Sequence, residues 1–153
     1  MKFVILFLAS NAGLGYAPIA SGTVGTLLGI PLFYLLAPLT PQEYVLGWLF
    51  VLFVSFWSAH RAGEIYGVTD DGRIVIDELI GYLTAVAFVP FSWNTALAAF
   101  LLFRLFDIVK LWPACWFDQK VKNGIGVVMD DVVAGVYAWL SLYALMSLFP
   151  QLF

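Results

Sequence analysis

The chain has 153 residues, of which 63% are hydrophobic and only 11% are charged. Soluble domains carry about 25% charged residues, so this composition excludes an ordinary soluble protein and indicates an integral membrane protein. The net charge of −3 argues against a nucleic-acid partner, and the length suits a single domain over residues 1–153.

Near the start of the chain, Lys2 and the apolar run Phe3 to Ala9 together resemble the first two regions of a signal peptide. As a helix this run covers only about 10 Å, whereas the hydrocarbon core of a bilayer is about 30 Å thick. The Gly/Ser/Thr stretch that follows is also too specific for a discarded leader. We therefore expect an interfacial or half-inserted segment.

Apolar runs bounded by proline or polar residues predict an all-α fold, a polytopic membrane helical bundle. We expect about five spanning or partly spanning helices, with Pro31 kinking the first. The expected ranges are 24–36, 44–59, 74–89, 95–111 and 130–149. Residues 113–126 read as a segment outside the membrane. The loop 60–73 contains Thr69-Asp70-Asp71-Gly72, which we interpret as a turn because it lacks the alternating ligands of a calcium loop.

The positive-inside rule orients these spans with the chain start, residues 60–73 and residues 112–129 in the cytoplasm. All seven Lys and Arg residues then lie on the cytoplasmic side. Nine of the ten carboxylates lie there too, because only Glu43 falls in an outer connection. The rule does not explain the acidic residues, so their clustering predicts a functional site at the cytoplasmic face.

Three charged residues, Arg104, Asp107 and Lys110, end the fourth apolar run. Their spacing of three places them on one slowly turning face of a helix. Each charge in a bilayer costs about 2.5–3.5 kcal/mol on insertion scales, so the group needs partners or a wet cavity. Long basic side chains could reach the headgroups, but Asp107 is too short to do so. We therefore interpret the group as functional.

Two carboxylate pairs, Asp77-Glu78 and Asp130-Asp131, join Asp107 at cytoplasmic helix ends. Five converging carboxylates would repel one another, whereas a divalent metal would hold them ionised. Oxygen ligands favour Mg²⁺ or Mn²⁺, and one cysteine and one histidine are too few for a structural zinc site. The five are thus the candidate metal ligands and catalytic residues.

Neighbouring residues on a helix diverge by about 100°, so each pair is expected to give one direct ligand and one supporting or capping group. The sequence leaves open which is which. The alternative for Asp130-Asp131 is simple helix capping after the Gly124-Ile125-Gly126 turn.

The stretch Pro18 to Thr26 is a Gly/Ser/Thr loop that is expected to open the first helix and offer backbone N–H groups to an anion. It lacks the Lys of a nucleotide-binding Walker loop, and its small residues could instead permit close helix packing. Together with nearby cations it predicts a phosphate site. The candidate substrate-binding residues are Ser21, Thr23, Thr26, Arg104, Lys110, Lys120 and Lys122.

A lipid phosphate is the expected substrate beside a bilayer, and the residues narrow the chemistry. His60 alone is too little for a phosphohistidine route with a separate acid or base. Val121 stands where a cysteine phosphatase needs Arg after Cys115, and no Asp-x-Asp occurs. Attack by a metal-activated water is what remains.

Five motifs are spread over nearly the whole chain. They are the Pro18 to Thr26 loop, Ile76 to Gly81, Phe103 to Lys110, Trp116-Phe117-Asp118, and Gly124-Ile125-Gly126 through Asp130 to Gly135. Together they resemble the phosphatidylglycerophosphatase A family of bacterial membrane lipid phosphatases. One departure is Leu111, where relatives commonly have proline.

The resemblance implies Mg²⁺-dependent hydrolysis of phosphatidylglycerophosphate to phosphatidylglycerol and phosphate, in phospholipid biosynthesis. It also implies a multi-pass protein of the bacterial inner membrane with its active site facing the cytoplasm. One alternative is an ion or proton transporter, but the polar groups collect at one face. A CDP-alcohol-type phosphotransferase is the other, but its Asp-Gly-x-x-Ala-Arg opening does not occur.

Overall fold

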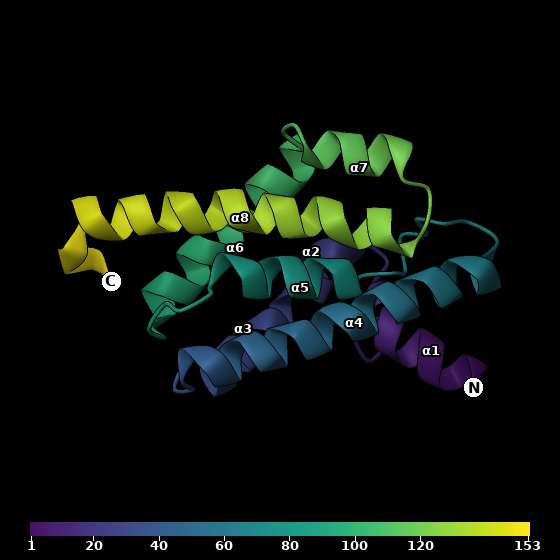
Figure 1. Ribbon diagram of the computed structural model, residues 1–153, viewed down its shortest axis with the longest axis horizontal. Helices are drawn as coiled ribbons and strands as arrows, with labels where there is room; N and C mark the ends of the chain where they lie inside the picture. Colours follow the sequence, from purple (N-terminus) through teal and green to yellow (C-terminus); the bar gives the residue numbers. More distant parts are fainter.

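The computed structural model describes all residues 1–153 and contains helices and no strands, which confirms the all-α expectation (Figure 1). Eight α-helices are joined by short connections and two 3₁₀ turns, η1 (Leu14–Tyr16) and η2 (Pro150–Leu152). The α-helices are α1 (Lys2–Ala9), α2 (Ser21–Leu27), α3 (Gly29–Leu36), α4 (Pro41–Tyr66), α5 (Ile76–Ala85), α6 (Trp93–Val109), α7 (Ala114–Lys120) and α8 (Gly124–Leu148).

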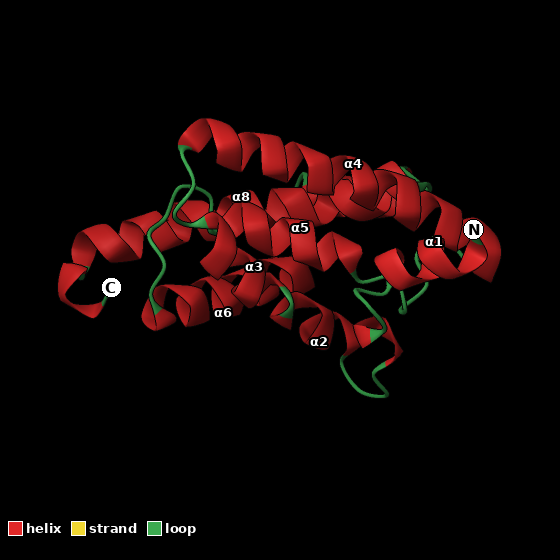
Figure 2. Cartoon of the chain, turned by 90° about the horizontal axis from the view of Figure 1, so that it is seen from below, coloured by secondary structure: helices red, strands yellow, loops and turns green.

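Helix α5 lies at the centre of the bundle, with α4 on one side and α3 and α6 on the other (Figure 2). Its main partner is α8, which runs alongside it and continues to the C-terminal end (Figure 1). All residues of α5 except Glu78 and Thr84 are buried. Because α5 joins the two apolar clusters of the core, its first turn is held firmly in place.

Two helices, α4 and α8, are long and apolar enough to cross a membrane, judged by length and composition. The expected third span is much shorter than its apolar run, since α5 has only ten residues and covers about 15 Å. It is too short to cross a hydrocarbon core of about 30 Å. The expectation of a full helix over residues 74–89 is therefore wrong.

Helix α4 continues beyond the expected end at Ala59. It runs to Tyr66 and ends at Gly67, which adopts the left-handed conformation with φ 74°. His60 and Arg61 lie within the helix, and both approach Glu64 one turn later, at 3.8 and 2.9 Å.

Helix α8 begins six residues before the expected start at Asp130. Asn123 caps it, because the Asn123 Oδ1 accepts hydrogen bonds from the N–H groups of Ile125 and Gly126, at 2.9 and 3.2 Å. Asp130 therefore lies inside the helix. The capping alternative for the Asp130-Asp131 pair does not hold.

The expected first span is divided into α2 and α3, with the break at Leu28. Proline at position 31 lacks the N–H that would bond to the carbonyl of Leu27, and its ring crowds that carbonyl. Helix α2 starts at Ser21, so Ser21, Gly22 and Thr23 form its first turn. The expected loop is thus helical in its second half.

Close contact between α5 and α8 depends on glycine at position 135. A Cβ there would collide with the carbonyl oxygen of Gly81 and come within 2.8 Å of the Thr84 Cβ. We expect Gly135→Ala to lower the free energy of unfolding by about 1–3 kcal/mol, as overpacked cores do. Thermal unfolding in detergent measures this. At Gly47 a Cβ has only one neighbour, at 3.7 Å, so Gly47→Ala should not destabilise; equal melting temperatures for the two variants would contradict the prediction.

Candidate active site

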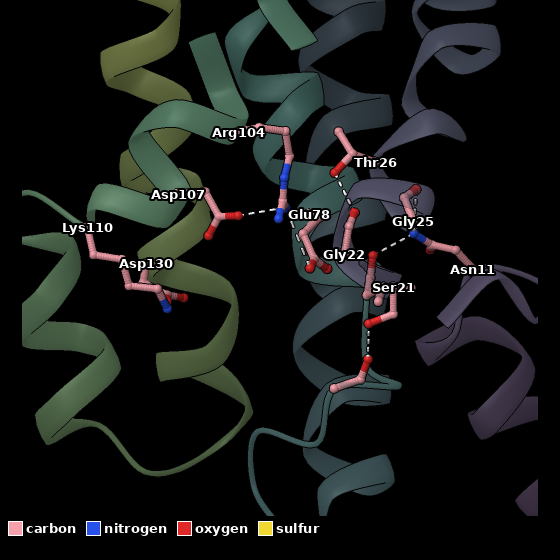
Figure 3. Close-up of polar contacts among 12 residues, drawn as sticks. Asn11, Ser21, Gly22, Gly25, Thr26, Glu78, Arg104, Asp107, Lys110 and Asp130 are labelled. Carbon is pink, nitrogen blue, oxygen red and sulfur yellow. Dashed lines mark hydrogen bonds and ion pairs between the residues drawn. The ribbon is translucent and has the colours of Figure 1, made fainter. Parts of the chain in front are cut away.

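Carboxylates from three helices meet at one cavity of about 150 Å³ at the first turn of α5. The structure brings together all five carboxylates that the sequence singles out, although they are up to 54 positions apart, from 77 to 131. Ser21 and Lys110 border the same cavity. Figure 3 shows four of its lining residues, Glu78, Asp107, Lys110 and Asp130, together with Arg104, which lies next to the cavity wall. The five carboxylates are Asp77, Glu78, Asp107, Asp130 and Asp131.

Three of these carboxylates, from Asp77, Glu78 and Asp131, form the tightest group. One oxygen atom from each lies within 4.8 Å of the others, which is close enough for all three to hold one metal ion. Both members of the first pair take part, because the first turn of α5 points them both into the cavity. Only one member of the second pair does, since Asp130 is engaged by a lysine.

The unpaired oxygen atoms in the site match what a metal would need. Asp77 Oδ1, Glu78 Oε2 and Asp130 Oδ1 are buried and accept no hydrogen bond. Such oxygens are costly in an apolar body unless a cation meets them. Hard oxygen donors of this kind suit Mg²⁺ or Mn²⁺. The residues present therefore fit a divalent cation.

Arg104 lies between two of the acidic groups (Figure 3). Its Nη1 is 2.6 Å from Asp107 Oδ2 and 3.8 Å from Glu78 Oε1, and its side chain is only 17% exposed. Neither Nη1 nor Nε makes an aligned hydrogen bond. Those buried N–H groups thus remain available to a third group, such as a phosphate oxygen.

Lys110 is placed differently from the expectation of a single helical face. It follows the last residue of α6 in the left-handed conformation, with φ 46°. From there its Nζ reaches Asp118 Oδ1 of α7 at 2.8 Å and Asp130 Oδ2 of α8 at 2.5 Å. Lys110 therefore connects the end of α6 with both α7 and α8 at the edge of the cavity.

The first turn of α2 lies against the Glu78 and Arg104 pair (Figure 3). A Cβ on Gly22 would collide with Glu78 Oε1 and come within 3.3 Å of Arg104 Nη1, so only glycine permits this approach. Ser21 borders the cavity, and its hydroxyl donates to the carbonyl of Gly72 at 2.6 Å. Thr26 is buried and donates to the Gly22 carbonyl at 2.8 Å.

The other candidate phosphate ligands lie outside the cavity. Thr23 is half-buried in α2 and does not border it. Lys120 is exposed. Lys122 donates to the carbonyl of Asp118 at 2.5 Å and lines a separate polar cavity of about 270 Å³ with His60.

Two further acidic residues take part that the sequence reasoning missed. Asp118 pairs with Lys110, and its place in the Trp116-Phe117-Asp118 motif was a usable signal. Asp70 borders the cavity, although its segment reads as a plain turn. The expected turn at residues 69–72 is stabilised by the residue after Asp70. Asp71 Oδ1 accepts hydrogen bonds from Arg73 N and Nε, at 3.1 and 2.6 Å. The hydrogen-bonded Arg73 guanidinium holds the pKa of the Asp71 carboxyl below its usual range.

The family model described as "Phosphatidylglycerophosphatase A" matches residues 7–146. The chain belongs to the phosphatidylglycerophosphatase A family. It is 40% identical over 130 residues to the phosphatidylglycerophosphatase A of Escherichia coli strain K12, covering 84% of this chain and 76% of the relative. It is 38% identical to the Haemophilus influenzae protein of the same name, covering 92% and 88% of the two chains.

A third relative has a name with a different substrate. This Bacteroides thetaiotaomicron protein, provisionally named a phosphatidylinositol-3-phosphatase, is 37% identical and covers 91% of each chain. No solved structure matches the chain. Family membership makes the chain a phosphatase and confirms the resemblance seen in its motifs. It decides against both the transporter and the phosphotransferase alternatives.

The contacts of Lys110 predict how α7 is held. Lys110→Met removes both ion pairs, so α7 loses its attachment to Asp130 on α8. We expect amide hydrogen exchange in residues 114–120 to accelerate at least about tenfold, while exchange in α4 stays the same. Lys120→Met is the control, because Lys120 is exposed and forms no ion pair. Unchanged protection of α7 in Lys110→Met would show that other contacts hold this helix.

Proposed function

We propose that this protein hydrolyses phosphatidylglycerophosphate to phosphatidylglycerol and inorganic phosphate with Mg²⁺, in phospholipid biosynthesis. The observation that carries the proposal is a three-carboxylate cluster on one cavity, next to the buried guanidinium of Arg104, which is paired with Glu78 and Asp107 of the cavity wall. A phosphomonoester with a bound cation needs both features. The family, and two relatives named for this substrate, support the choice of lipid.

In this proposal Asp77, Glu78 and Asp131 hold the Mg²⁺, with Mn²⁺ as a possible substitute. When bound, the ion supplies Lewis-acid stabilisation of the phosphate and of the water that attacks it. The free oxygen of Asp130 lies on the same cavity and supports this set. Asp107 holds Arg104 in place through their ion pair at 2.6 Å.

Arg104 is the proposed principal phosphate ligand, because its Nε has no hydrogen-bond partner and its Nη1 pairs with Asp107 and Glu78 without an aligned hydrogen bond. Lys110 adds positive charge at the cavity edge, and Ser21 borders the cavity with its hydroxyl hydrogen-bonded to the Gly72 carbonyl. The negative charge that develops on the phosphoryl oxygens is thereby met by groups already in place. Thr23, Thr26, Lys120 and Lys122 do not border the cavity, and the proposal gives them no contact with the phosphate.

We place the cavity at the cytoplasmic face of a multi-pass protein in the bacterial inner membrane. The two long apolar helices, α4 and α8, support spanning. The cavity lies near the first two turns of α8 and close to the loop after α4, where most basic residues gather. This distribution agrees with the positive-inside rule. A phosphate at this depth lies level with lipid headgroups.

Phosphate release from defined lipids in detergent micelles tests the function. We expect the purified protein with Mg²⁺ to release phosphate from phosphatidylglycerophosphate faster than from phosphatidic acid or phosphatidylinositol 3-phosphate. Excess EDTA should abolish release, and Mg²⁺ should restore it. Asp77→Asn should raise the Mg²⁺ concentration for half-maximal rate by about 10–100-fold.

The control is Glu43→Gln, because Glu43 caps α4 far from the cavity and should keep normal Mg²⁺ dependence. Undiminished release in excess EDTA would refute the metal requirement. Faster release from phosphatidylinositol 3-phosphate would refute the proposed substrate and favour the one in the name of the Bacteroides relative.

A further inference from the structure

Asp70 is the one carboxylate on the cavity that the site described so far does not use. Asp77, Glu78 and Asp131 converge on one point, Asp107 is paired with Arg104, and Asp130 with Lys110. Asp70 also borders the cavity, yet it forms no hydrogen bond and no ion pair. Unlike the other five, it lies in an exposed position. Its lone pairs are therefore free and in contact with solvent.

The neighbours of Asp70 fix the loop that carries it. On one flank, the Gly72 carbonyl accepts the hydroxyl of Ser21 from α2 at 2.6 Å. Arg73 is paired with Asp71 at 2.6 Å, and its guanidinium lies 3.7 Å from the centre of the Tyr66 ring at the end of α4. The loop is thus attached to both α2 and α4. Asp70 is held at the cavity mouth while its own carboxylate stays unbound.

The direction of attack in phosphoryl transfer makes this position informative. The attacking and leaving oxygens lie roughly in line on opposite sides of the phosphorus. The leaving oxygen belongs to the lipid and must point toward the apolar body of the protein and the membrane. Water must then approach from the opposite, aqueous side. Asp70 is the only one of the six carboxylates lining the cavity that lies in an exposed position, where solvent water reaches it.

We propose that Asp70 is the general base that accepts a proton from the attacking water, an inference that rests on the proposed function. The water oxygen forms the new bond to phosphorus while its proton passes to the Asp70 carboxylate. The ester P–O bond breaks, and its electron pair stays on the lipid oxygen. That oxygen takes a proton from a water molecule at the level of the lipid headgroups, and Asp70 returns its proton to solvent, leaving the lipid alcohol and hydrogen phosphate.

Asp70→Asn keeps the shape of the side chain but removes its basicity. We expect kcat for phosphatidylglycerophosphate to fall about 100-fold or more, with KM within about threefold of the wild type. Glu43→Gln is the matched control, because it makes the same acid-to-amide change at a carboxylate that caps α4 and does not border the cavity. Its kcat should stay within about threefold of the wild type.

Two readouts separate a base from a residue that only supports the loop or binds metal. Added formate should restore part of the kcat of Asp70→Ala, since a small carboxylate can enter the space and take the proton. Mn²⁺ binding, followed by electron paramagnetic resonance on the purified protein, should have the same affinity in Asp70→Asn and in the wild type.

The outcomes are distinct from those of the function assay. If the wild type releases no phosphate from the lipid, the proposed function fails. If the wild type is active, the role of Asp70 is refuted by near-normal kcat in Asp70→Asn, by absence of formate rescue, or by weakened Mn²⁺ binding. The last result would make Asp70 a metal ligand.

Discussion

Burial of five carboxylates in an apolar helical body is the constraint on which the rest of this structure depends. Two of them are neutralised within the chain, Asp107 by Arg104 and Asp130 by Lys110. The remaining three, Asp77, Glu78 and Asp131, face one another, and Asp77 and Glu78 each have a buried oxygen atom without a hydrogen-bond partner. Like charges in a low-dielectric interior repel strongly unless a cation lies between them. If the acidic cluster binds a divalent cation, as proposed above, that cation also contributes to the stability of the fold.

The packing of α5 against its neighbours holds this acidic cluster in position. Helix α5 is too short to span a membrane, yet it is the most enclosed element, so its first turn presents Asp77 and Glu78 from a rigid base. Glycines let the backbones of α2 and α8 come close to it, at Gly22 beside Glu78 and at Gly135 beside Gly81. Rigid supports of this kind hold catalytic groups in place without reorganisation during the reaction.

The sequence motifs predict the family, and the apolar runs predict the all-α class. The sequence also predicts that five carboxylates come together, because charged residues in an apolar chain are costly unless they meet partners. It does not predict local geometry that tertiary contacts decide. Lys110 leaves the helical face because it takes a left-handed conformation that lets it reach Asp118 and Asp130. Thr26 lies in a motif, but its hydroxyl donates to the Gly22 carbonyl of its own helix and does not reach the cavity. Asp70 sits in an ordinary turn sequence, and only the folded loop brings it to the cavity.

Thermal unfolding as a function of Mg²⁺ concentration tests the coupling of charge and fold most directly. The account predicts that Mg²⁺ stabilises the wild type, by about 2.7 kcal/mol at a concentration 100 times the dissociation constant. Without metal, Asp131→Asn should melt at a higher temperature than the wild type, because one of three facing charges is gone, and it should respond weakly to Mg²⁺. The account would be contradicted by a wild type whose melting temperature does not change with Mg²⁺ concentration. It would also be contradicted if Mg²⁺ raised the melting temperature of Asp131→Asn as much as that of the wild type.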